Sequence, residues 1–268
     1  ALDLGYTNRK ELGEEIQLLT NLKELYLRSN EKISIEGIKN LTNLEVLDLG
    51  YTNRKELGEI KNLDNLKELY LYNNNLISME GIENLKKLEI LDLSNNEIEK
   101  VENIKGLNNL KSIDKLKGLD LSYNKIISTE GIEELYNLEN LYLRNNHIEE
   151  IGNLKKLYNL KVLDLSHNKI TSMNGIENLY KLKVLYLMNN KIYKLCNLND
   201  LLQLEYLILD KNKISDISKI PVKIKYIDLG IQEIDLKDYK NTENKYSLNT
   251  SFIKLRGGED LDIDYILE

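Results

Sequence analysis

Apolar residues recur along most of this chain in one short pattern, L-x-x-L-x-L-x-x-N. Within each copy the L-x-L segment predicts a short strand with both leucines on one face, because successive side chains of a strand point to opposite faces. The intervals between the strand-opening residues are 23, 22, 22, 22, 28, 22, 22, 22, 22 and 20 residues. These openings are Leu2, Leu25, Leu47, Leu69, Leu91, Leu119, Leu141, Leu163, Leu185, Leu207 and Ile227. This regularity predicts stacked copies of one unit joined in a parallel sheet.

An asparagine follows the strand pattern in most copies. A buried amide can both donate and accept hydrogen bonds where the chain turns off the strand, so stacked copies predict an asparagine ladder. The positions are Asn30, Asn74, Asn96, Asn124, Asn146, Asn168, Asn190 and Asn212, with Thr7, Thr52 and Gln232 in three units. A second apolar set, such as Met79, Ile82, Leu85 and Leu88, has three-residue spacing. It predicts a 3₁₀ or irregular outer wall, because 22 residues leave little room for a long α-helix.

These motifs resemble the leucine-rich-repeat family, in its short 22-residue subclass, over roughly residues 1–232. The resemblance implies an α/β fold, a right-handed superhelical horseshoe. Its concave side would be a parallel sheet of about eleven strands, and its convex wall would be 3₁₀ or irregular. A single unit cannot bury its own leucines, so each unit depends on its neighbours. Because Leu2 and Leu4 already belong to a strand, we expect the natural sequence to extend before Ala1.

Two segments depart from the repeat. Residues 233–268 show a looser alternation, broken by Gly257 and Gly258, and predict a β-rich C-terminal cap or the start of a following β domain. The interval between Leu91 and Leu119 holds six extra residues around 111–118. A local insertion explains it better than a deletion, because the glycines of the outer wall keep their alternation through it. The insertion is either a contact point at the sheet edge or a tolerated irregularity.

The residues between and just after the strand leucines are expected on the exposed, concave face, where aspartate and tyrosine alternate with one slip between Asp92 and Asp120. Tyrosine combines a large contact area with a polar tip and is enriched at binding hot spots. The predicted partner-binding residues are Tyr26, Arg28, Asp48, Tyr70, Tyr72, Asp92, Asp120, Tyr142, Arg144, Asp164, His167 and Tyr186. Duplication of a two-unit block explains the alternation equally well, since Asp–Tyr pairs suit an exposed sheet.

The charged residues of this face are mainly acidic. Arg28, Arg144 and Lys211 are outnumbered there by nine acids: Asp3, Glu24, Asp48, Glu68, Asp92, Asp120, Asp164, Asp210 and Asp228. Such a surface favours a protein partner with a basic surface. Because the aspartates are expected to be exposed, we expect no burial that would shift their pKa values toward catalytic use.

Composition excludes several other functions. With 37 basic and 44 acidic residues the net charge is -7, which argues against nucleic-acid binding. The sequence contains no run of 18 or more apolar residues, so it predicts no membrane-spanning helix. His147 and His167 lack metal-ligand spacing, and Cys196 is expected to be an apolar filler of the outer wall. We therefore expect no enzyme, no catalytic residues, no metal and no cofactor.

Two groups within the family share further segments with this chain. The segments ISMEGIENLKKLEILDLSNN and ITSMNGIENLYKLKVLYLMNN resemble intracellular phosphatase-regulating repeats, which implies a regulatory scaffold that binds a phosphatase or another enzyme. The segments ISDISKI and IQEIDLKDY resemble bacterial internalin-type surface proteins. We favour the second group, which implies adhesion or host recognition through the concave face at the cell surface or in secreted form, rather than in the cytoplasm. A targeting arm of a larger multidomain protein is the remaining alternative.

Overall fold

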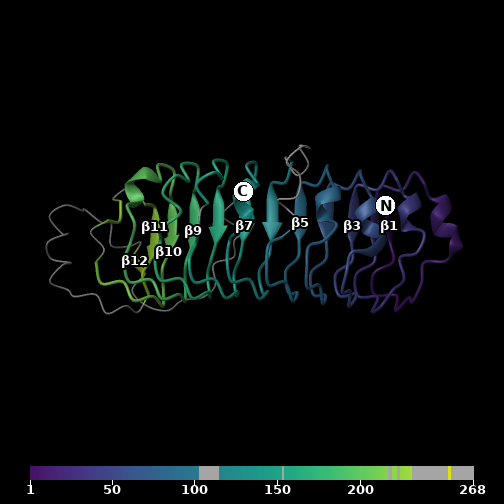
Figure 1. Cartoon of the computed structure of the whole chain (residues 1–268), viewed down its shortest axis with the longest axis horizontal. Coiled ribbons are helices and arrows are strands. Elements are labelled where there is room, and N and C mark those ends of the chain that lie inside the picture. Colours follow the sequence, from purple (N-terminus) through teal and green to yellow (C-terminus); the bar gives the residue numbers. More distant parts are fainter. Residues whose placement is uncertain (103–114, 153, 217–218, 222–223, 231–252, 255–268) are drawn as a thin grey trace.

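The computed structural model describes residues 1–102, 115–152, 154–216, 219–221, 224–230 and 253–254. The chain forms a solenoid of coils stacked along one long axis, and each coil contributes one strand to a single sheet (Figure 1). All neighbouring strands are parallel and pair in chain order. The predicted fold class is thereby confirmed.

The strands are short and fall where the L-x-L pattern predicts them. They are β1 (Leu2–Asp3), β2 (Glu24–Tyr26), β3 (Val46–Asp48), β4 (Glu68–Tyr70), β5 (Ile90–Asp92), β6 (Gly118–Asp120), β7 (Asn140–Tyr142), β8 (Val162–Asp164), β9 (Val184–Tyr186), β10 (Tyr206–Ile208), β11 (Tyr226–Asp228) and β12 (Ile253–Lys254). The strand leucines pair in register from unit to unit, as in Leu25 with Leu47. Strand β12 pairs with β11 and is the part of predicted segment 233–268 that lies within the described residues.

The outer wall combines 3₁₀ turns with irregular turns, as the three-residue apolar spacing predicts. The 3₁₀ turns are η1 (Glu14–Leu18), η2 (Ile38–Asn40), η3 (Gly58–Asn62), η4 (Ile82–Asn84), η5 (Ile132–Glu134) and η6 (Leu198–Asp200). Successive coils approach closely at this wall. A Cβ on Gly131, whose φ is 101°, would lie 2.1 Å from the carbonyl oxygen of Val101. No helix in the described part of the chain has the length and apolarity that a bilayer crossing requires.

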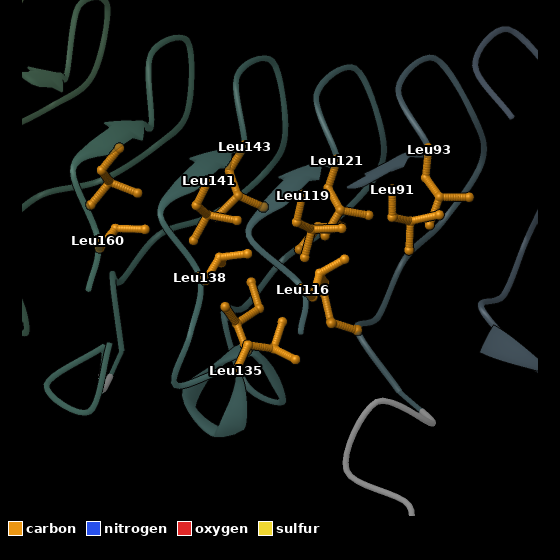
Figure 2. Close-up of a cluster of buried hydrophobic side chains, with 14 of the residues drawn as sticks. Leu91, Leu93, Leu116, Leu119, Leu121, Leu135, Leu138, Leu141, Leu143 and Leu160 are labelled. Atoms are coloured by element: carbon orange, nitrogen blue, oxygen red, sulfur yellow. The ribbon is translucent and has the colours of Figure 1, made fainter. Parts of the chain in front are cut away.

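Leucines from every coil form the core. Leu91, Leu119 and Leu141 on β5, β6 and β7 are each almost fully buried and point to the same side of the sheet (Figure 2). Leu91 pairs in register with Leu119 although 28 residues separate them. The extra residues of this coil therefore leave the sheet undisturbed. Of the predicted insertion at 111–118, residues 111–114 lie outside the described part of the chain.

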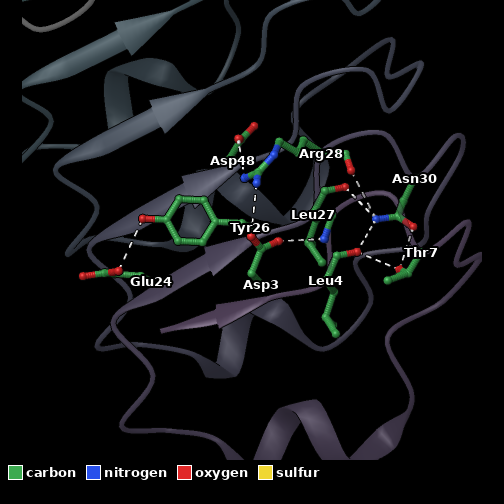
Figure 3. Close-up of polar contacts among 10 residues, drawn as sticks. Asp3, Leu4, Thr7, Glu24, Tyr26, Leu27, Arg28, Asn30 and Asp48 are labelled. Carbon is green, nitrogen blue, oxygen red and sulfur yellow. Dashed lines mark hydrogen bonds and ion pairs between the residues drawn. The ribbon is translucent and has the colours of Figure 1, made fainter.

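The predicted asparagine ladder is confirmed. The side-chain amide of Asn146 donates to the carbonyl of Leu143 in its own unit, at 3.1 Å, and to that of Leu121 in the preceding unit, at 2.9 Å. Its Oδ1 accepts the backbone N–H of Ile126 at 2.9 Å. Figure 3 shows the equivalent donation from Asn30 to the carbonyl oxygen of Leu27. The buried amide thus ties each unit to the one before it and satisfies backbone groups that face no water.

Candidate binding surface on the strand face

The exposed side of the sheet, here called the strand face, carries the predicted binding residues. In β2 to β9 the residues between the strand leucines form one continuous row in register, in the order Tyr26, Asp48, Tyr70, Asp92, Asp120, Tyr142, Asp164 and Tyr186. Arg28, Tyr72, Arg144 and His167 follow the strands along the same row of units. The structure therefore brings the twelve predicted residues onto one surface.

Each aspartate of this row has a local structural role. Its Oδ1 accepts the backbone N–H two residues later, at 2.9 Å for Asp48 and Gly50 and at 2.8 Å for Asp120 and Ser122. Asp164 makes the same contact with Ser166 at 2.8 Å. The bond closes a turn at the end of the strand, as short polar side chains commonly do. Part of the Asp/Tyr alternation is thus explained by the fold itself.

The expectation that these aspartates are exposed is wrong for Asp48 and Asp164, which are buried, while Asp92 and Asp120 are half-buried. Asp48 and Asp164 are only 7% and 5% exposed. Beside Asp48, the Tyr72 ring of the next unit lies across Gly50 and helps to bury the carboxylate. Burial raises the pKa of the Asp48 and Asp164 carboxyls. Burial also raises the pKa of Asp120 to about 6, and the negative charge of Asp92 adds to the effect.

At the N-terminal end of the strand face, Arg28 organises a charged and aromatic cluster (Figure 3). Its guanidinium contacts Asp3 at 3.1 Å and Asp48 at 3.6 Å. The guanidinium carbon also lies 5.7 Å from the ring centroids of Tyr6 and Tyr26. The positive charge of Arg28 is therefore compensated within the chain, and its contribution to a partner would be mainly stacking area.

Two exposed tyrosines of this cluster are missing from the predicted site. Tyr6 and Tyr51 are 72% and 53% exposed, and the ring of Tyr51 packs edge-on against Tyr72 with centroids 5.6 Å apart. Both tyrosines have a left-handed backbone, with φ of 58° and 55°. At this position four other units carry asparagine, which tolerates that conformation better. The departure from asparagine is the sequence signal that could have identified them.

The slip in the alternation places two carboxylates side by side. Asp92 and Asp120 pair in register on β5 and β6, and each accepts the backbone N–H of a serine two positions later. Neither forms an ion pair with any other residue that the structure describes. Large side chains border this acidic pair on both sides: Tyr70 and Tyr72 from the β4 unit, and Tyr142 and Arg144 from the β7 unit.

The C-terminal part of the strand face carries an apolar cluster. Val162, Val184, Tyr186 and Ile208 form a buried cluster, and Tyr142, Met188, Tyr206 and Tyr226 pack against it. Sequence reasoning missed most of these residues because it examined the position before each strand leucine only for acids. Four consecutive units carry Val, Val, Tyr and Tyr there, and this was the available signal.

Two other kinds of site, a metal centre and a reactive thiol, find no support in the described residues. They contain no group of three or more His, Cys, Asp or Glu side chains that could hold a metal ion. Cys196 is buried in the outer wall, and burial raises the pKa of its thiol to about 11, which disfavours the reactive thiolate. A cleft of about 590 Å³ lies between coils of the outer wall, beside Gly152 and Gly175, and not on the strand face.

Comparison with known families agrees with the repeat geometry. A family model described as "Leucine rich repeat" matches residues 136–192. A second, described as "Leucine Rich repeats (2 copies)", matches residues 20–64, 64–109 and 114–156. No curated protein sequence is significantly similar to the chain.

Solved structures of bacterial proteins are similar to this chain. An internalin from Listeria monocytogenes is 28% identical, with 84% of this chain and 72% of that chain covered and a TM-score of 0.64. A leucine-rich-repeat protein from Leptospira interrogans is 25% identical, with 97% and 78% covered and a TM-score of 0.65. The functional domain of another Listeria monocytogenes internalin, InlJ, is 23% identical over 91% of this chain and 56% of that one, with a TM-score of 0.72. At that identity it shows the fold alone.

Proposed function

Because this chain belongs to the leucine-rich-repeat family, we propose that its strand face recognises a protein partner. Leucine-rich-repeat domains such as internalins are protein-interaction modules and are typically not enzymes. A rigid stack of coils suits this task, because it holds a long row of side chains in fixed register without a cost for ordering them on binding.

The observation that carries the proposal is the acidic pair, Asp92 and Asp120, bordered by tyrosines. A lysine or arginine side chain of the partner would form ion pairs with both carboxylates. Its aliphatic stem or guanidinium would pack against Tyr70, Tyr72 or Tyr142. No described cation forms an ion pair with Asp92 or Asp120, although Arg144 borders them, whereas the similar carboxylate Asp48 is paired with Arg28. The acidic pair is thus the part of the row whose charge is left for a partner.

The apolar cluster supplies the second half of the proposed contact. The buried members of this cluster lie on β8, β9 and β10, two to four strands away from β6. Neighbouring strands are about 4.8 Å apart, so the cluster lies roughly 10–20 Å along the sheet from the acidic pair. The partner therefore carries a basic side chain at one end of its contact surface and apolar or aromatic side chains at the other.

The setting we propose is recognition at a bacterial cell surface or in the secreted state. The similarity to an internalin supports it. The net charge of -7 favours a protein over a nucleic acid as the partner. Asp92 and Asp120 on the strand face would then orient the partner, and the apolar cluster would contribute most of the area buried on binding.

Selection of peptides displayed on phage against the immobilised domain tests this function. We expect enriched sequences to combine a Lys or Arg with aromatic or aliphatic residues. The double substitution Asp92→Asn and Asp120→Asn should weaken a selected peptide about tenfold or more, since it removes both charges and keeps the shape. Glu150→Gln, an exposed acid of the outer wall, is the matched control. Equal binding of the double variant and the wild type would refute the proposed site.

A further inference from the structure

A second surface lies on the flank of the solenoid, in the turns that lead into the strands. In the β7 unit this turn is bounded by Leu135 and Leu138, both buried, and the N–H of Leu138 donates to the carbonyl of Leu135 at 3.0 Å. Figure 2 shows both leucines pointing into the core. Since the two ends of the turn are anchored inward, the residue after the first leucine, Tyr136, is directed to solvent.

The same turn recurs in the next three units, and each places a large apolar side chain in solvent. Tyr136, Tyr158, Tyr180 and Leu202 are 41%, 53%, 46% and 66% exposed. The equivalent positions of the N-terminal units carry small or charged residues: Thr20, Thr42, Asp64 and Lys86. These exposed side chains are confined to four consecutive units and add nothing to the core, so the column is a candidate contact surface.

A ladder of alternating lysine and glutamate runs beside this column, three residues later in each unit. It reads Lys23, Glu45, Lys67, Glu89, Lys117, Glu139, Lys161, Lys183, Glu205 and Lys225. Ion pairs connect neighbours along it, with Nζ–Oε distances of 2.9 Å for Lys23–Glu45, 3.1 Å for Lys117–Glu89 and 2.8 Å for Lys225–Glu205. Its charge alternation continues through the long coil between β5 and β6.

The alternation fails between β8 and β9, where two lysines are neighbours. The N–H of Lys183 donates to the carbonyl of Lys161 at 2.8 Å, so their backbones are directly adjacent. Lys161 is paired with Glu139 at 2.5 Å, whereas Lys183 forms no ion pair with any described residue. The break falls beside Tyr158 and Tyr180, the central members of the apolar column.

We propose that this flank patch, formed by Lys161, Lys183 and the column Tyr136, Tyr158, Tyr180 and Leu202, binds an acidic segment of a protein. A carboxylate of that segment lies between the two lysines and restores the alternation of the ladder. Apolar side chains of the segment cover Tyr158 and Tyr180. The patch is separate from the strand face, so it does not depend on the function proposed for that face.

Charge complementarity selects a peptide carboxylate over a polyanion. The chain as a whole carries a net charge of -7, and the glutamates that pair with neighbouring lysines lie within the same ladder. Two adjacent lysines surrounded by glutamates would release few counterions from a nucleic acid. We therefore expect a nucleic acid to bind this patch weakly. A single carboxylate flanked by apolar side chains matches both the local charge and the exposed tyrosines.

The test uses a fluorescein-labelled synthetic peptide of alternating glutamate and leucine, titrated with the whole chain and followed by fluorescence anisotropy. Peptides with glutamine or lysine in place of glutamate, and a single-stranded oligonucleotide of similar length, are the comparison ligands. We expect the acidic peptide to bind most tightly, and its binding to weaken when salt rises from about 0.05 M to about 0.5 M.

Two variants locate the site. Lys183→Gln and the double substitution Tyr158→Ser and Tyr180→Ser should each weaken the acidic peptide by about fivefold or more. Lys67→Gln is the matched control: it removes a lysine of the same ladder that is paired with Glu45 and has the polar Asp64 beside it, and we expect unchanged affinity. Circular dichroism verifies that each variant is folded. Equal binding of the Lys183→Gln and Lys67→Gln chains, equal binding of the glutamine peptide, or preference for the oligonucleotide would each overturn the proposal.

Discussion

The phenol ring of Tyr72 lies across Gly50 of the preceding unit. A Cβ added to Gly50 would fall 2.3 Å from Cζ of that ring. Arg28 lies over Gly5 in the same way, with its Cγ 3.1 Å from the position of an added Cβ. At these two places the strand face follows a rule between units: a large side chain in one unit covers the glycine that stands two positions after the aspartate of the unit before it.

Substitution Gly50→Ala tests this rule. The new methyl group would displace the Tyr72 ring and break its edge-on contact with Tyr51, and aromatic contacts of this kind contribute about 0.5–1.5 kcal/mol. We expect the free energy of unfolding, measured in urea, to fall by about 1 kcal/mol relative to the Gly118→Ala chain. Gly118 is the matched control because its added Cβ would meet nothing nearer than 3.9 Å. Equal stabilities of the two alanine variants would show that the overlap with Tyr72 has no energetic consequence.

The asparagine ladder predicts a larger loss of stability. Asn146→Ala leaves the carbonyls of Leu121 and Leu143 and the N–H of Ile126 without the amide that now bonds them. Buried polar groups left unsatisfied cost about 1–3 kcal/mol each, and partial access of water lowers the sum, so we expect a loss of about 2–4 kcal/mol in urea unfolding. The exposed Asn174→Ala should change stability by less than about 0.5 kcal/mol.

Threonine provides an internal check on the ladder. At the equivalent position the Thr52 hydroxyl donates to the carbonyl of Leu49 at 2.7 Å, and Oδ1 of Asn74 lies 3.1 Å away as an alternative acceptor of the same proton. Asn146→Thr can keep the first kind of bond, so it should lie between the wild type and Asn146→Ala in stability. If the threonine and alanine variants were equally unstable, lost packing rather than lost hydrogen bonding would explain the effect.

The flank ladder predicts a stability contribution that depends on pH. Glu45 contacts Lys23 at 2.9 Å and Lys67 at 2.5 Å, and these bonds lower its pKa from 4.5 to about 2. A carboxyl whose pKa is lowered by folding stabilises the fold above its unfolded pKa, and this contribution is lost as pH falls through the folded value. We expect Glu45→Gln to be less stable than the wild type at pH 7, with the difference disappearing as pH falls from about 4.5 to about 2. A difference that persists at pH 2, or that about 1 M salt does not reduce, would contradict the assignment to ion pairs.

Periodicity along the chain was enough to predict most of the fold. Each unit repeats the same inward leucines and the same asparagine, so the position of Leu119 or Asn146 follows from its own unit and one neighbour in register. The strand row of candidate residues was predictable for the same reason. These features depend on the backbone path, and one residue pattern determines that path in all units.

The properties of the site were less predictable because they depend on side chains of different units. Asp48 was expected to be exposed, yet it is buried where Tyr72 crosses Gly50, a contact that spans two strands. Valine is common in strands, so Val162 and Val184 do not stand out in the sequence. They form an apolar cluster only because they pack together with Tyr186. A column of residues must therefore be analysed together with the columns beside it.

Asp120 couples the stability of the fold to the proposed binding. Burial and the charge of Asp92 raise its pKa from 3.8 to about 6, so folding favours its neutral form. The favourable contribution is complete below about pH 4 and is lost as pH rises through about 6. We expect Asp120→Asn, which keeps an acceptor for the N–H of Ser122, to be about 1–2 kcal/mol more stable than the wild type at pH 7, after allowance for partial exposure. The two chains should be equally stable below about pH 4.

Binding should change in the opposite direction over the same range of pH. A basic peptide selected on the strand face needs the ionised carboxylate, so its affinity for the wild type should rise from pH 5 to pH 7 with a midpoint near the Asp120 pKa of about 6. Titration of the Asp120 carboxyl carbon by NMR gives that midpoint directly, and the Asp120→Asn chain should lack the step in both stability and affinity. A flat binding profile in the wild type between pH 5 and pH 7 would separate Asp120 from recognition. If instead affinity rises while stability falls, the strand face keeps two adjacent aspartates at the expense of its own stability, which is the behaviour expected of a binding site rather than of a purely structural sheet.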